Sequence, residues 1–136
     1  MKITAQKIKD QLRQKWPIIS FMWLPDKTYW MPTIKEVRDT VSKCQIHKAM
    51  IFKDDIADCD DFALQLHAEV KRLCNTAGLG VHWPFGEAFG LKWQGLVEQH
   101  TANIAVTLTG IYLIEPQTNE IWQADSNKDQ ILLVKM

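Results

Sequence analysis

The chain has 136 residues, of which 46% are hydrophobic and 24% are charged, a composition typical of an ordinary globular domain. Its 16 lysines and arginines balance its 16 aspartates and glutamates, so the formal net charge is zero. A chain without a basic excess is not expected to bind nucleic acid. Its length allows a hydrophobic core without disulfides or a structural metal, so we expect residues 1–136 to form a single domain.

The sequence shows no targeting or membrane segment. Its longest apolar run, residues 18–24, falls well short of the roughly 20 residues that cross a bilayer. The first ten residues mix charged and apolar side chains, unlike a signal peptide. The three cysteines cannot all pair and show no Cys-x-x-Cys spacing, which favours a reducing compartment. We therefore expect a cytoplasmic protein with no membrane contact.

The first third of the chain has one clear helical pattern. The spacing of Ile8 and Leu12 predicts an amphipathic helix over residues 4–16. Pro17 ends that helix. Residues 17–32 hold three prolines among their aromatics in no regular order, which predicts an irregular or partly extended segment.

Two further helices are predicted downstream. Thr33 followed by Glu36 is a capping-box pattern, and the apolar spacing after it predicts a helix to about Ser42. From Cys59 the apolar residues recur at steps of four and three, which predicts one helix that ends before Gly78. Cys59 would lie in the first turn of that helix, on its inward face.

The remainder of the chain, after Val81, is rich in β-branched and aromatic residues. Strands are predicted over residues 88–93, 99–106, 111–114, 120–123 and 131–134. Helices followed by strands indicate an α+β fold, with N-terminal helices, a central helix that carries Cys59 and a C-terminal antiparallel sheet.

Cys59 is a candidate nucleophile because of its position. Backbone amides and the helix dipole at a helix N-terminus favour the thiolate form of a cysteine. Nucleophilic catalysis also needs an imidazole to accept and return the proton, and a third group to orient the imidazole. The segment around Cys59 is acidic and contains Asp54, Asp55, Asp58, Asp60 and Asp61.

Four histidines are candidates for the base. His67 lies two turns further along the Cys59 helix, so its ring cannot reach the helix start. His47 and His82 lie in segments whose orientation the sequence does not predict. His100 begins a predicted strand and is the best candidate.

A hairpin would bring a carboxylate to His100. A short turn would pair Val106 with Ile111, and therefore Ala102 with Glu115. His100 then points to the same face as Glu115, at a diagonal spacing of about 7–8 Å that long side chains can bridge. We expect Glu115 to orient His100, although a register shift of one residue would separate them.

The run Asp-Cys-Asp-Asp-Phe-Ala at residues 58–63, with His100 and then Glu115-Pro-Gln, resembles the papain-like and transglutaminase-like cysteine hydrolase superfamily. Within it, the likeness is to a Cys-His-Glu protease domain of a fungal lectin, over about residues 50–123. The resemblance implies a papain-like fold. It also implies a cysteine peptidase or amidase, or acyl transfer of the transglutaminase type, with a peptide or protein substrate. Cys59 would be the nucleophile, His100 the general base and acid, and Glu115 the orienting carboxylate.

The same resemblance implies a dependence on Ca²⁺ or Mn²⁺. Hard cations require several oxygen ligands in one small volume. Asp60 and Gln117 are the first candidates for ligands, and Asp61 is a weaker one. Aspartates in the first turn of a helix are also favoured by its dipole without any metal.

The oxyanion donor and the substrate cleft are less well defined. Papain-type enzymes carry a glutamine shortly before the nucleophile, whereas residues 52–56 contain none. The backbone amide of Cys59 and an indole, Trp30 or Trp83, are candidate donors. A cleft between the Cys59 helix and the sheet would be lined by Trp83, Phe85, Phe89 and Trp93, although such aromatics more often belong to a core.

Other functions remain open. The main alternative is a non-catalytic binding or interaction module on the same fold. Peptidoglycan amidases with an Asp-Cys-Ser-Gly helix start are less similar, because Asp60 and Asp61 replace Ser-Gly here. A structural zinc site is not favoured, since the cysteines form no close-spaced pair of ligands.

Overall fold

The computed structural model describes residues 1–54, 58–76 and 82–136. Asp55, Gly78 and Val81, which enter the sequence predictions, lie outside the described residues. The helices are α1 (Ala5–Lys15), α2 (Ile34–Cys44), α3 (Ile46–Ala49) and α4 (Cys59–Thr76). The strands are β1 (Lys2–Thr4), β2 (Phe21–Trp23), β3 (Thr28–Trp30), β4 (Phe85–Trp93), β5 (Leu96–Thr107), β6 (Gly110–Glu115), β7 (Glu120–Gln123) and β8 (Gln130–Lys135).

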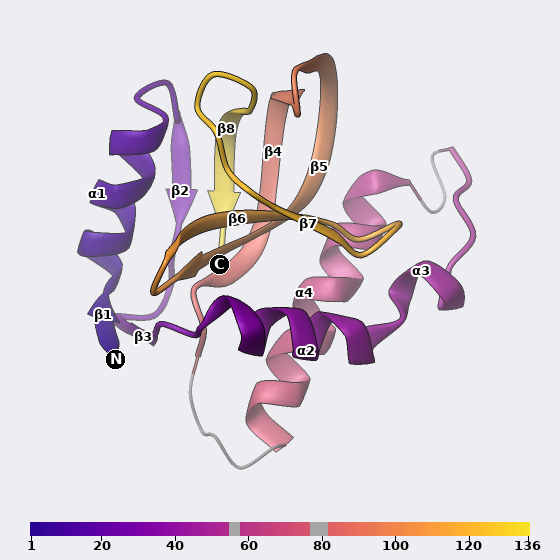
Figure 1. Ribbon diagram of the computed structural model, residues 1–136, viewed down its shortest axis with the longest axis horizontal. Helices are drawn as coiled ribbons and strands as arrows, with labels where there is room; N and C mark the ends of the chain where they lie inside the picture. The colour runs from indigo at the N-terminus through magenta and orange to yellow at the C-terminus, as the bar shows by residue number, and fades with distance from the viewer. Residues whose placement is uncertain (55–57, 77–81) are drawn as a thin grey trace.

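The fold is α+β, with one mixed six-stranded sheet and a small two-stranded sheet (Figure 1). The large sheet has the strand order β2-β8-β4-β5-β6-β7. Its strands from β8 to β7 pair antiparallel, as predicted for the C-terminal half, and β2 adds to β8 in parallel. The small sheet pairs β1 with β3 antiparallel.

The three predicted helices form as expected. The capping box of α2 is complete, since the Glu36 amide donates to Thr33 Oγ1 at 3.1 Å and the Thr33 amide donates to Glu36 Oε2 at 3.0 Å. Helix α4 begins at Cys59, and the Asp58 carbonyl accepts its first hydrogen bond, from Phe62 N at 3.1 Å. Asp58 is therefore the N-cap residue of the helix that carries Cys59.

Helices cover the two faces of the large sheet at different places. Helix α1 packs on one face, in a cluster with Ala88, Ala102, Ile104 and Leu113. Helices α2 and α4 pack on the other face, in a second cluster with Phe85, Ala105 and Ile114. In Figure 1, α1 stands beside β2 at one side of the molecule, and α2 and α4 lie near the β5 to β7 end. Within the described residues, no helix is both long and apolar enough to cross a membrane.

Candidate active site

His100 and Glu115 form a short hydrogen bond. His100 Nε2 and Glu115 Oε2 are 2.5 Å apart, and the two side chains are only 15% and 19% exposed. The register behind this contact is the predicted one, because Val106 pairs with Ile111. The Gln117 amide donates to the other carboxylate oxygen, Glu115 Oε1, at 3.2 Å. The carboxylate is thus held by its own chain while it accepts or shares the imidazole proton.

The environment of His100 favours the imidazolium form. Burial alone would lower the pKa of His100, but the hydrogen bond and the charge of Glu115, with a further contribution from the charge of Glu98, raise it above the ordinary value. A carboxylate that hydrogen-bonds a ring nitrogen also fixes the tautomer and orientation of the ring. With Nε2 bonded to Glu115, His100 can therefore exchange a proton through its other ring nitrogen, Nδ1.

Trp93 packs against the imidazole. Its ring meets that of His100 edge to face, at 5.4 Å between centroids and an interplanar angle of 84°. Trp93 is 4% exposed, and its indole Nε1 has no hydrogen-bond partner among the described residues. From the sequence, Trp93 is expected to line the cleft, and Trp30 or Trp83 is the candidate indole donor. In the structure the indole beside His100 is that of Trp93.

Cys59 is half-buried in the first turn of α4. The turn is closed by Asp61, whose Oδ2 accepts a hydrogen bond from the Asp58 amide at 3.1 Å. Hydrogen bonds to acidic groups at a helix start stabilise the turn and satisfy its free amides. The thiol forms no hydrogen bond with His100 in the part of the chain that the structure describes.

A polar contact brings the Cys59 helix onto the His100 strand. Asn103 on β5 donates from Nδ2 to the carbonyl of Ala63, one turn into α4, at 2.8 Å. Because side chains alternate along a strand, the His100 side chain points to the face of the sheet opposite that of Asn103. The pairing of β5 with β6 ends at Asn103 and Ile114, so the part of β5 that carries His100 is not paired with β6.

The acidic residues at the start of α4 form a cluster. Carboxylate oxygens of Asp58, Asp60 and Asp61 lie within 4.8 Å of one another. Hydrogen bonding to Asp60 is the largest cause that raises the pKa of Asp58 to about 6, followed by desolvation and by the negative charges of both neighbours. The sequence had not assigned Asp58, whose backbone already caps the helix. The metal role of Asp60, Asp61 and Gln117 stays a prediction.

The other histidines have their own surroundings. His67 Nδ1 lies 2.7 Å from Glu87 Oε2, in a buried pair between α4 and β4. His82 is exposed and its Nδ1 is 3.9 Å from a carboxylate oxygen of Asp26.

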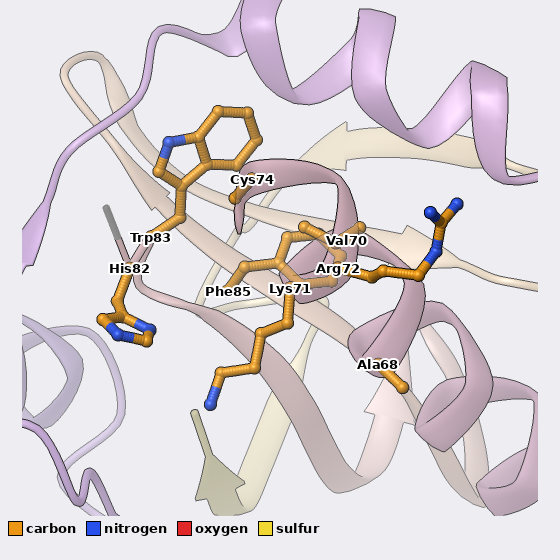
Figure 2. A pocket seen from close by; sticks show the side chains of 8 residues that line it. All are labelled: Ala68, Val70, Lys71, Arg72, Cys74, His82, Trp83 and Phe85. Carbon is orange, nitrogen blue, oxygen red and sulfur yellow. The ribbon is translucent and has the colours of Figure 1, made fainter. Parts of the chain in front are cut away.

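A pocket of about 290 Å³ lies at the C-terminal half of α4 (Figure 2). It includes two members of the predicted cleft, Trp83 and Phe85, but not Phe89 or Trp93. The pocket is at the opposite end of α4 from Cys59. Its lining residues are Ala68, Val70, Lys71, Arg72, Cys74, His82, Trp83 and Phe85.

Comparison with solved structures finds lectins. This chain matches the crystal structure of Polyporus squamosus lectin bound to the human-type influenza-binding epitope Neu5Aca2-6Galb1-4GlcNAc, with a TM-score of 0.75 and 20% identity. It also matches a structure named the PSL1a-E64 complex, with a TM-score of 0.71 and 19% identity. The matches cover 98% of this chain but 49% and 51% of theirs, so it spans about half the length of either. No protein-family model and no curated protein sequence matches.

These matches correct the predicted membership of the papain-like and transglutaminase-like superfamily. The first structure is named for a lectin and the second for PSL1a and E64, and neither is named as a papain-like protein. The same matches correct the expectation of a calcium-dependent thiol protease with a catalytic triad, because that expectation rested on the superfamily resemblance. At about 20% identity the likeness concerns the fold alone: the chain has the α+β fold of one half of the Polyporus squamosus lectin chain.

Proposed function

We propose that Cys59, His100 and Glu115 serve cysteine-dependent acyl transfer on a peptide or amide substrate. In this reaction the Cys59 thiol gives its proton to His100 and the sulfur attacks the carbonyl carbon; the C–N bond breaks and the amine leaves with that proton. Water then gives a proton to His100 and adds to the thioester carbon, the C–S bond breaks, the carboxylic acid leaves, and Cys59 regains its proton from His100.

The observation that carries the proposal is the His100–Glu115 hydrogen bond. A half-exposed surface pair would be unremarkable, but this pair is largely buried, short, and oriented by a second hydrogen bond to Glu115 Oε1. A general base needs a fixed tautomer and a carboxylate that stabilises its protonated form. Cys59 is carried by the helix that Asn103 fastens to the same strand, while the His100 side chain leaves that strand on the face opposite Asn103.

A non-catalytic binding module is the second candidate. The comparisons favour it more than they favour catalysis, because one matched structure is named for a lectin with a bound sialylated glycan. This chain corresponds to only half of that lectin, so the glycan is not transferred to it as a ligand. In a binding module, Cys59 would be an unreactive, half-buried thiol.

Thiol alkylation separates the two candidates. We expect iodoacetamide at pH 6–8 to modify Cys59 at least about tenfold faster than Cys44 or Cys74, and His100→Ala to remove most of that advantage. The other two thiols are internal controls, because burial raises the pKa of both to about 11. The rates are measured by mass spectrometry of the digested protein, with His82→Ala as the matched control for loss of a histidine.

Each outcome has a clear meaning. If Cys59 reacts no faster than Cys44, or if His82→Ala and His100→Ala act alike, acyl transfer is wrong and the binding module is favoured. E64, the compound named with PSL1a, provides a second test. A mass increase on the intact protein that is absent in Cys59→Ser supports the thiol site. Binding of E64 without a mass increase supports the binding module.

A further inference from the structure

Asn103 is a polar side chain in the middle of an apolar layer. It is 0% exposed and sits in the layer between α4 and the sheet, which contains Phe62, Ala105 and Ile114. Its Nδ2 donates two hydrogen bonds, to the carbonyl of Ala63 on α4 at 2.8 Å and to that of Gly86 on β4 at 3.0 Å. One amide group thus ties together a helix and two strands.

The packing of this layer does not require an amide. The Asn103 Oδ1 atom is buried and has no hydrogen-bond partner among the residues that the structure describes, and an unsatisfied buried oxygen is unfavourable by about 1–3 kcal/mol. A leucine, which has the same number of side-chain heavy atoms, would avoid that penalty. A hydrogen bond is directional, however, and apolar contacts are not. What the amide adds is a defined placement of Ala63 against β5.

That placement concerns all three residues of the proposed site. Cys59 precedes Ala63 by one helical turn, a rise of about 6 Å. His100 precedes Asn103 by three strand residues, about 10 Å. Asn103 pairs across the ladder with Ile114, and Glu115 is the next residue. Asn103 is the point where the elements that carry the thiol, the imidazole and the carboxylate are joined.

We propose that Asn103 is a positioning residue, which sets where the first turn of α4, with Cys59, stands relative to His100. The effect on thiol chemistry rests on the proposed function, whereas the placement of the helix does not. Asn103 contacts neither sulfur nor imidazole in the described structure, and it acts through Ala63 and the backbone of β5.

Asn103→Leu tests this role against Thr107→Val. Thr107 is also buried on β5, but its hydroxyl donates to the Gly110 carbonyl within the hairpin and not to α4. We expect Asn103→Leu to lower the hydrogen-exchange protection of the first two turns of α4 by about tenfold, and Thr107→Val to leave it unchanged. We also expect Asn103→Leu to change the pH profile of Cys59 alkylation while those of Cys44 and Cys74 stay the same.

The results decide the two proposals separately. Unchanged exchange in α4 together with an unchanged Cys59 profile overturns the role of Asn103, whatever the wild-type thiol does. If wild-type Cys59 is unreactive but α4 loses protection in Asn103→Leu, acyl transfer fails and the positioning role holds. If Asn103→Leu does not fold, the smaller Asn103→Ser is measured in the same way, since serine cannot bridge to both Ala63 and Gly86.

Discussion

At the scale of single residues, the defining interaction is between His100 and Glu115. Both side chains leave neighbouring strands at the end of the ladder, where the imidazole is shielded by Trp93 on one side. In such a setting a carboxylate exerts a stronger electrostatic effect on the ring than it would in water. Burial is the largest single effect on the pKa of His100 and lowers it, and the hydrogen bond and charge of Glu115, with the charge of Glu98, together outweigh it.

Glu115→Gln should lower the pKa of His100, because it removes the charge that opposes the effect of burial. A histidine whose pKa is raised by folding stabilises the fold below the unfolded value, about 6.5, and this contribution is lost as pH rises through the folded pKa. The stability difference between wild type and Glu115→Gln should accordingly be largest at acidic pH. NMR titration of the His100 ring and urea unfolding at several pH values measure both effects.

Glu98→Gln is the matched control, since Glu98 contributes only through its charge and less than Glu115 does. We expect it to lower the pKa of His100 by a smaller amount. Equal shifts in the two variants would mean that the hydrogen bond to Glu115 has no special weight in the charge state of the ring.

At the scale of elements, the start of α4 combines a cap, a thiol and an acidic cluster. Asp60→Asn should return the pKa of Asp58 from about 6 toward its usual range, because hydrogen bonding to Asp60 is the largest cause of the rise. Asp61→Asn should lower it less. Because its pKa is raised, the protonated Asp58 carboxyl stabilises the fold. This contribution is complete at pH values below the unfolded-state pKa, about 3.9, and is lost as the pH rises through about 6.

Carbon-detected NMR titration of the aspartate carboxyl groups measures these values, with Asp54→Asn as a control from the same acidic segment. A pKa of Asp58 that stays near 6 in Asp60→Asn would show that the neighbouring carboxyl does not set it. Added Ca²⁺ that abolishes the titration of Asp58 would instead support the predicted metal site.

Elements with a regular pattern could be predicted from the sequence, and elements without one could not. The spacing from Cys59 and the Thr33 capping box predicted α4 and α2, and alternation predicted the strands of the antiparallel sheet. Strands β2 and β3 lie in the segment predicted as irregular or partly extended. Their positions could not be predicted, because each is three residues long and pairs with a remote partner. Local alternation cannot appear in so short a run.

The site was predicted in part, for a related reason. Hairpin register is a local property, so the contact of His100 with Glu115 followed from the short turn between their strands. The contact of Asn103 with Ala63, and that of Trp93 with His100, depend on how a helix and a bulged strand pack. No residue spacing encodes these contacts, although a lone asparagine in an apolar strand was a visible sign.

At the scale of the whole molecule, the backbones of β4 and β8 lie so close together at Gly86 that there is no room for a side chain. A Cβ atom on Gly86 would lie 1.8 Å from the Lys135 carbonyl oxygen and 2.7 Å from Met136 Cα, both backbone atoms. Gly86→Ala should therefore lower the free energy of unfolding by about 3 kcal/mol, as overpacking in a core does. Urea unfolding measures the change.

Gly95→Ala is the comparison for loss of glycine alone. No atom of the described part of the chain lies within 4 Å of a Cβ built there, and its φ of +87° is what disfavours alanine. Such a left-handed position costs about 1 kcal/mol. Equal effects of the two variants would mean that the sheet separates readily at Gly86, and that β4 and β8 are less tightly joined than the geometry implies.

The place of β8 in the sheet has a consequence for biosynthesis. Strand β8 comes last in the sequence, yet it lies between β2 and β4 and supplies the partner of both. During translation, the hairpins of β4 to β7 can pair as they emerge, whereas β2 can pair only after β8 has been made. Until residues 130–135 leave the ribosome, the backbone of β2 lacks its partner strand, and an unpaired strand is a site where partly folded chains can associate.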